Sequence, residues 1–251
     1  MSQIIALFNQ SGGVGKTTLT MNLGYQLAKR NHRVLLVDMD PQASLTTFMG
    51  IDSVELRKTV YEAVVGDEPL PIHHSIQSMD IAPSNINLSA AELELVAVIM
   101  REMRLKEALS PYVKEYDFIL IDCPPSLGIL SMISLVAATN VLVPIQTQFK
   151  SFQGTDLLLN TVAKLRSKAN RSLAIAGFIP TMYDGRTAQE TRTLKAIREQ
   201  LSPLATVFNP VPRTIVFADA SEARLPLAIF QAKHPAVASM ETIVKHLEKL
   251  K

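Results

Sequence analysis

The sequence predicts a doubly wound α/β fold, in which a mostly parallel twisted sheet has helices on both faces. Short runs rich in Ile, Val and Leu recur along the chain, and segments of helical periodicity separate them. Strands that are apolar throughout are typical of parallel sheets buried on both faces. We expect strands at 3–9, 33–38, 79–82, 117–122, 140–146, 173–180 and 205–208, and helices at 16–30, 87–109, 153–168, 188–201 and 236–249.

One domain, residues 1–251, is the simplest organisation. Pro and Gly lie near strand ends rather than in a linker, and the chain has no repeat or low-complexity tract. Ser89 and Glu92 have capping-box spacing, which predicts a helix start just after Asn87. Segment 50–78 is the least regular part, and we expect an insertion there with at most one short helix.

Composition excludes several classes of protein. The single cysteine, Cys123, excludes an internal disulfide, and the five histidines have no ligand-like spacing with it, so no structural zinc or iron–sulfur centre is expected. We expect Cys123 to be a small buried residue rather than a nucleophile. The absence of a long apolar run or a basic, then apolar, N-terminal signal favours a cytoplasmic protein.

Positive charge is concentrated in one region of the chain. Residues 150–213 contain ten Lys or Arg and four acidic residues, although the whole chain has a net charge of only +2. Such a region could bind a polyanion through phosphate contacts. Solvated helix faces would explain the same composition, and composition alone does not separate the two interpretations.

The segment NQSGGVGKTT, residues 9–18, has the pattern of a phosphate-binding loop. A strand, a glycine-rich turn and a helix N-terminus in this order surround one anionic volume with backbone N–H groups. Lys16 can contact the β and γ phosphates, and the Thr17 hydroxyl can ligate Mg²⁺. Gln10 and Ser11 depart from the standard loop and its best-known variant, which have Gly and Lys there.

Three acidic residues follow two other predicted strands. Asp38 and Asp40 end the run RVLLVDMD, and Asp122 ends YDFILID. The carboxyl ends of parallel strands meet at one edge of a sheet, so all three should lie beside the phosphate loop. We expect Asp122 to hold Mg²⁺, often through water, and Asp40 to orient water. Asp38 has a structural role or belongs to the metal shell. Capping of the next helix is the alternative for such acids.

NQSGGVGKTT, RVLLVDMDPQASLT, YDFILIDCPPSLG, TMYDGRT and NPVPRTIVFADASEARLPL together resemble the ParA/MinD family of deviant Walker ATPases. The motifs span nearly the whole chain in the family's order. The resemblance implies Mg-ATP binding, slow hydrolysis that depends on Asp40, and an ATP-dependent sandwich homodimer that positions cargo. We also expect Lys16 and Asp38 to be catalytic residues. The resemblance assigns Asp122 a place behind Mg²⁺ at Thr17 and segment 209–213 a place beside adenine. Within that segment we expect Pro212 to pack on the base, although a loop residue without that role is the alternative. The resemblance assigns phosphate contacts to Gly12, Gly13, Gly15, Lys16, Thr17 and Thr18, and we also expect Ser11 and Val14, in the same loop, to border the nucleotide.

Ser11 departs from the family pattern, in which a signature lysine reaches the phosphates of the opposite subunit. Serine has no such charge, so another cation is expected near the site. Lys150, after the predicted strand 140–146, is our candidate, although a solvent-exposed loop lysine is the alternative. Ser11 and the segment FKSFQG resemble the carboxysome-positioning McdA branch, which implies nucleoid DNA binding and a McdB-type adaptor that stimulates hydrolysis.

The DNA interpretation rests on the basic region. Arg186 matches an arginine that the family uses for DNA, whereas a second family arginine is Val216 here. Arg192, Lys195 and Arg198 share one face of the expected helix 188–201 and could substitute for it. We expect non-specific binding through phosphates and a nucleoid-associated protein.

Three other functions remain open. The first is a plasmid or chromosome partition ATPase of the same family. The second is a MinD-like membrane-cycling ATPase, because residues 236–249 carry an apolar stripe; a helix docked on the sheet explains that stripe equally well. The third is a metabolic enzyme of related fold, an ATP-dependent synthase or a metal-centre reductase, for which the chain has no evident metabolite site and only one Cys.

Overall fold

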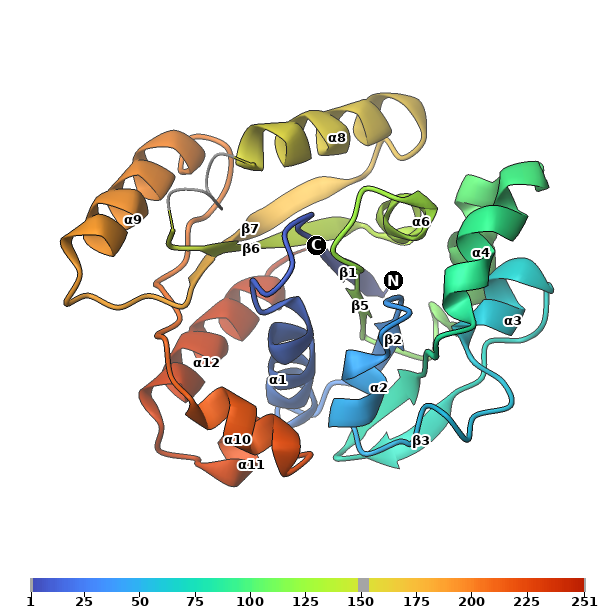
Figure 1. Cartoon of the computed structure of the whole chain (residues 1–251), viewed down its shortest axis with the longest axis horizontal. Coiled ribbons are helices and arrows are strands. Elements are labelled where there is room, and N and C mark those ends of the chain that lie inside the picture. The colour runs from blue at the N-terminus through green and yellow to red at the C-terminus, as the bar shows by residue number, and fades with distance from the viewer. Residues whose placement is uncertain (1, 149–153, 251) are drawn as a thin grey trace.

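A seven-stranded sheet forms the centre of the molecule in the computed structural model, which describes residues 2–148 and 154–250. Its order is β3-β4-β2-β5-β1-β6-β7 (Figure 1). Neighbouring strands are parallel except for the edge strand β3, which pairs antiparallel with β4. The strands are β1 (Gln3–Leu7), β2 (Val34–Asp38), β3 (His73–Ile76), β4 (Met79–Ala82), β5 (Phe118–Asp122), β6 (Asn140–Gln146) and β7 (Ala174–Thr181).

Helices cover both faces of this sheet (Figure 1). Alternate residues of β1 belong to two separate apolar clusters: Ile4 and Ala6 to one, Ile5 and Leu7 to the other, as the two-residue period of a strand requires. The Ile4 cluster includes α3 (Val60–Val65), α4 (Leu88–Glu94), α5 (Arg104–Leu109), α6 (Ile129–Ala137), α8 (Thr155–Lys168) and α9 (Ala188–Leu201). The Ile5 cluster includes α1 (Lys16–Ala28), α2 (Ser44–Phe48) and α12 (Pro235–Leu247); α10 (Val216–Glu222) and α11 (Leu227–Phe230) pack beside it with α12 in a small third cluster.

The predicted fold class is confirmed, and six of the seven predicted strands agree with the structure within about two residues. The seventh, at 205–208, is wrong. This segment makes one isolated bridge, Phe178 to Val207, in which Phe178 N–H donates to Thr206 O (2.8 Å) and Phe208 N–H to Phe178 O (2.9 Å). Pro203 and Pro210 flank the segment and lack the N–H needed to extend the ladder.

The single helix predicted over 87–109 is also wrong. It is divided into α4, two 3-10 turns (Leu95–Ala97 and Arg101–Met103) and α5. The break follows from two backbone conformations: Val98 is extended, and Met100 is left-handed with φ 57°. The Ser89–Glu92 capping box is absent, because Asn87 is already in right-handed helical geometry and the Ser89 hydroxyl donates to Ile86 O (2.7 Å).

Several elements were not predicted. The antiparallel strand β3 lies in the segment expected to be irregular, which also contains the short helix α3, and helices α2, α6, α10 and α11 were missed. The missed helices α2, α10 and α11 are seven residues or shorter, and helix α6, ILSMISLVA, is buried at most positions. Short helices have too few turns to establish a 3.6-residue period, and a helix buried on most sides has no polar stripe.

Candidate nucleotide site

The phosphate loop connects β1 to the N-terminus of α1. Gly13 and Gly15 have φ values of 70° and 91°, a left-handed conformation that glycine adopts without steric cost. Lys16 begins the helix and is buried, and its Nζ donates to Asn9 O (2.9 Å) and Ser11 O (3.0 Å). The Lys16 ammonium therefore bridges two backbone carbonyls at the start of the loop. Burial lowers the pKa of Lys16, and the neighbouring Asp122 carboxylate opposes that shift.

Side chains distant in sequence hold this loop in place. Asn9 accepts from Ser11 N–H (2.9 Å) and donates to Pro144 O in β6 (2.7 Å). Thr181, at the end of β7, donates to Val14 O (3.0 Å). Neither Asn9 nor Thr181 was predicted as a site residue, and only their polar character beside strand ends could have indicated them. Their contacts preorganise the loop without any ligand.

Asp38 and Asp122 lie side by side at the carboxyl edge of the sheet, paired in the register of β2 and β5. Both side chains are fully buried. The Thr46 hydroxyl (2.7 Å) and N–H (2.9 Å) donate to Asp38 Oδ2, and Asp40 N–H donates to Oδ1 (3.1 Å). Burial raises the pKa of Asp38 to about 6 despite these hydrogen bonds. Asp38 thus fixes the backbone from which Asp40 extends.

Asp122 is a buried carboxylate with one oxygen that is not hydrogen-bonded to any described residue, and both are properties of a cation ligand. Burial raises its pKa well above the ordinary value, and the nearby Asp38 raises it further, whereas the Thr17 hydroxyl and the Lys16 ammonium act in the opposite direction. Within residues 2–148 and 154–250, Oδ2 of Asp122 has no hydrogen-bond partner. A buried carboxylate oxygen of this kind, beside a threonine hydroxyl, is a donor set that suits Mg²⁺. The structure thus brings together Thr17 and Asp122, the residues predicted for the metal.

Asp40 lies beyond β2 and is partly exposed. Its Oδ1 accepts from Gln42 N–H (3.0 Å), and its own N–H is bound to Asp38. A partly exposed carboxylate on an anchored backbone can bind water without leaving the site. The position of Asp40 is therefore compatible with its predicted role in orienting water.

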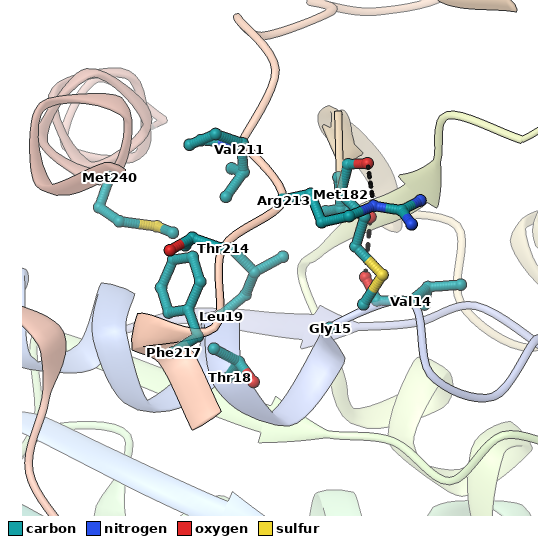
Figure 2. A pocket seen from close by; sticks show the side chains of 12 residues that line it. Val14, Gly15, Thr18, Leu19, Met182, Val211, Arg213, Thr214, Phe217 and Met240 are labelled. Carbon is teal, nitrogen blue, oxygen red and sulfur yellow. Dashed lines mark hydrogen bonds between the residues drawn. The ribbon is translucent and has the colours of Figure 1, made fainter. Parts of the chain in front are cut away.

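An apolar pocket of about 140 Å³ adjoins the phosphate loop (Figure 2). Pro212, the residue expected to pack on adenine, is part of its wall. Arg213 Nε donates to Met182 O (3.4 Å), which joins two parts of the wall. Val211 and Arg213 belong to the segment 209–213, which was expected beside adenine. Six other lining residues were not predicted, namely Leu19, Thr181, Met182, Thr214, Phe217 and Met240. They come from four separate segments, so no local pattern marks them.

The residues predicted to bind DNA lie apart from this pocket. Arg192, Lys195 and Arg198 are all exposed on α9, with Lys195 3.7 Å from Glu199. The buried residues of that helix, including Leu194 and Ile197, occupy the opposite face. The Arg186 side chain is 90% exposed and pairs with Asp184 (2.7 Å) just before the helix. The structure therefore gathers the four cations at one helix.

Three further expectations concern Lys150, Cys123 and the C-terminal stripe. Lys150 lies outside the described residues. Cys123 is buried as expected, and burial raises the pKa of its thiol to about 12. The stripe of α12 is buried against the sheet through residues such as Met240 and Ile243, which agrees with the docked-helix interpretation. No helix among the described residues is long and apolar enough to cross a membrane.

The fold and this loop define a nucleotide-binding α/β protein of the P-loop class. Residues 2–175 match a family model described as an AAA domain. The chain is 38% identical over 237 residues to the sporulation initiation inhibitor protein Soj of Bacillus subtilis, covering 93% of both proteins. It is 35% identical to the chromosome partitioning protein ParA of Myxococcus xanthus, covering 99% of this chain and 89% of that protein. The chain belongs to the ParA/MinD family of ATPases.

Two solved structures are also similar. Apo McdA from Cyanothece has a TM-score of 0.89 and 25% identity, covering 98% of this chain and all of that one (100%). A cobyrinic acid a,c-diamide synthase from Mycobacterium smegmatis, with bound ATP analogue and magnesium, has a TM-score of 0.88 and 32% identity, covering 99% and 95%. The predicted cofactors, ATP and Mg²⁺, agree with the molecules bound in that second structure.

Proposed function

We propose that this chain binds and hydrolyses Mg-ATP, that ATP closes a sandwich dimer of two copies, and that the dimer binds DNA without sequence preference to position cargo. The observation that supports this most directly is the buried pair Asp38 and Asp122 beside Lys16 in the phosphate loop. A ligand that brings both phosphate and a divalent cation would match these opposite charges.

The phosphates would bind the backbone N–H groups of the loop and the ammonium of Lys16. Thr17 and Asp122 would hold Mg²⁺, which when bound neutralises charge that develops on the phosphates. Lys16 already lies across the loop through Asn9 O and Ser11 O, so little reorganisation would be needed on binding. Pro212 and the apolar pocket wall would contact the base.

Asp40 would accept a hydrogen bond from the attacking water and orient it. Asp38 would act through Asp40, because it binds the Asp40 N–H and is itself held by Thr46. We expect Asp40→Ala to retain ATP affinity, to lose most turnover and to remain on DNA after ATP is added. ATP binding, phosphate release and DNA association measured on the same preparation test this expectation. Unchanged turnover would remove Asp40 from the mechanism.

Ser11 stands where the family has its signature lysine, so a sandwich dimer of this chain would need another cation at the interface. We propose Lys150 as the replacement cation for the opposite subunit's phosphates. Lys150→Ala should then bind ATP as a monomer, which size-exclusion chromatography with light scattering can measure. A variant that dimerises normally with ATP would leave Lys150 without this role.

DNA binding is supported by the basic face of α9, where Arg192, Lys195 and Arg198 are exposed. Binding of DNA by this surface would make the protein nucleoid-associated. Membrane cycling has less support, because the apolar stripe of α12 is buried against the sheet. Co-sedimentation with DNA or with liposomes, each in the presence of ATP, separates the two functions.

The cargo is a finer part of the proposal. Ser11 and the likeness to McdA favour carboxysomes with a McdB-type adaptor, whereas the higher identity to Soj and ParA favours plasmid or chromosome partition. Stimulation of ATP hydrolysis by each kind of adaptor, compared directly, distinguishes them. The likeness to the diamide synthase makes a metabolic reaction the remaining candidate. ATP turnover with DNA and without any metabolite would argue against that reaction.

A further inference from the structure

Glu190 is a buried acid in the first turn of α9 that has no place in the nucleotide chemistry described above. Only 7% of the residue is exposed. Its Oε2 accepts from Asp184 N–H (2.6 Å) and from the Thr147 hydroxyl (3.1 Å), and its Oε1 accepts from Arg213 Nη2 (3.2 Å). One carboxylate thus binds three segments that are far apart in sequence. Hydrogen bonds of this charge-assisted kind are among the stronger ones in proteins.

These partners continue to the nucleotide site. Arg213 lines the pocket and donates to the carbonyl of Met182, another pocket residue (Figure 2). Thr147 N–H donates to Thr181 O (3.0 Å), and the Thr181 hydroxyl in turn donates to Val14 O in the phosphate loop (3.0 Å). A continuous set of hydrogen bonds therefore runs from Glu190 to both the wall of the pocket and the phosphate loop.

The same residue fixes the beginning of α9. The Glu190 N–H donates to the hydroxyl of the N-cap residue Thr187 (3.4 Å), and Glu190 shares the buried face of the helix with Leu194 and Ile197. The exposed face carries the three predicted DNA contacts, Arg192, Lys195 and Arg198. Any shift of Arg213 or of residues 181–184 would therefore act on the end of the basic helix.

The connecting segment is held in an uncommon conformation. Met182 has a φ of 55°, which non-glycine residues adopt only when surrounding contacts require it. Backbone strain of this kind is maintained by the surrounding contacts and is found most often at ligand clamps and switch regions. A nucleotide in the pocket would contact Met182 and Arg213 directly, so its binding changes the contacts on which that conformation depends.

We propose that Glu190 is a positioning residue that couples nucleotide occupancy to the basic face of α9, so that the nucleotide state controls DNA affinity through this carboxylate. The proposal rests on the proposed function, because it assumes both ATP at the pocket and DNA at α9. Coupling between two sites requires one structural element that both ligands affect. The hydrogen bonds of Glu190 join the pocket wall to the start of α9 and so provide such an element. A residue that only stabilises the start of the helix would affect stability and leave the two sites independent.

The test compares Glu190→Gln with Glu199→Gln. Both variants remove one negative charge from α9, but Glu199 is exposed and pairs only distantly with Lys195, so the control reproduces the change in net charge. Thr147→Val is a second variant, which removes one hydroxyl from the same network and covers the case in which Glu190→Gln does not fold. Thermal unfolding establishes which variants are folded.

Two measurements are made on each folded protein. The first is the dissociation constant for double-stranded DNA with Mg-ATPγS and with Mg-ADP. We expect the ratio of the Mg-ADP constant to the Mg-ATPγS constant to fall about tenfold in Glu190→Gln, within the usual range for coupling between sites, and nucleotide affinity to change less than about threefold. Glu199→Gln should keep the wild-type ratio, and Thr147→Val should shift it in the direction of Glu190→Gln.

The second measurement is amide hydrogen exchange in residues 182–201 with and without Mg-ATPγS, in the absence of DNA. Slower exchange on nucleotide binding in the wild type, lost in Glu190→Gln, supports the coupling. The same protection in both proteins, or none in the wild type, overturns it. If the wild type gains protection but never binds DNA, the DNA function fails and the coupling to α9 stands. A less stable Glu190→Gln with an unchanged ratio of DNA constants gives Glu190 a structural role only.

Discussion

Asp38 is a fully buried carboxylate, and a second buried carboxylate, Asp122, lies beside it across the strand pair. Its pKa is raised from 3.8 to about 6 by burial. The folded protein therefore binds more protons than the unfolded chain between about pH 4 and 6, so its free energy of unfolding decreases as pH rises through that interval. The difference of about two pKa units corresponds to a contribution on the order of 3 kcal/mol.

We expect Asp38→Asn to reduce this pH dependence in the nucleotide-free protein. Urea unfolding at a series of pH values between 4 and 7 measures it, with Asp52→Asn as a control because Asp52 is an exposed acid that also accepts a backbone N–H. An equal slope in Asp38→Asn and the wild type would mean that Asp38 does not titrate in this interval. Added Mg²⁺ should stabilise the protein more at pH 7 than at pH 5, because protons compete for the same carboxylates.

Residues of this site that lie within one sequence motif could be predicted, whereas residues that act from distant parts of the chain could not. Gly15, Lys16 and Thr17 lie within one short motif whose chemistry is encoded by neighbours, and the sequence placed them correctly in the loop. Thr46, which holds Asp38, and Thr181, which holds the loop, act across gaps of 8 and 167 residues. A lone threonine has no distinctive pattern, so its role depends on the folded topology and could not be read from the chain.

At the scale of helices and strands, helix α3 shows that residue spacing does not by itself predict where a helix begins. Its first turn has a complete capping box: the Thr59 side chain accepts a backbone N–H, and the Glu62 carboxylate accepts from Thr59 N–H (2.6 Å). The capping box was predicted at the Ser89–Glu92 pair, which has the same spacing but lies one position inside α4. Spacing alone cannot give the backbone conformation of the first residue, which decides whether its hydroxyl can cap the helix.

The two pairs give a direct comparison. Thr59→Ala should lower the free energy of unfolding by about 1 kcal/mol, because the amide it caps loses its partner. Ser89→Ala should have an effect below about 0.5 kcal/mol, since Ser89 is exposed and makes only a local bond to Ile86 O. Chemical denaturation of both variants measures the difference. Equal effects would contradict the assignment of the cap to α3.

On the scale of the whole molecule, the strand order explains where the functions lie. β1, β2 and β5 are adjacent, so their carboxyl ends bring the phosphate loop, Asp38 and Asp122 together. This arrangement followed from the predicted parallel sheet, which is why the acids were placed correctly. The edge beyond β7 was less predictable. Segment 205–212 pairs there through two single-residue bridges, Phe178 to Val207 and Tyr183 to Pro212, rather than as a strand. Those bridges bring Arg213 to Glu190, a contact that no strand pattern indicates.

Charge distribution over the molecule gives the last prediction, which concerns DNA. Arg192, Lys195 and Arg198 share the exposed face of α9, and binding through phosphates should release about one counterion per contact. Substituting any one of them with Ala should weaken binding of unrelated DNA sequences to a similar extent. It should also reduce the slope of log affinity against log salt concentration by about 0.9 per lost contact.

Lys114→Ala is the matched control, because Lys114 is exposed but precedes β5 at the amino edge of the sheet, opposite the phosphate loop. It removes the same charge and should leave the salt slope unchanged. Titrations in the presence of Mg-ATP at several salt concentrations measure both quantities. If Lys114→Ala and the α9 variants lower affinity equally, attraction by net charge explains the binding. If only the α9 variants lower the slope, contact lies on that helix, where Glu190 connects it to the nucleotide pocket.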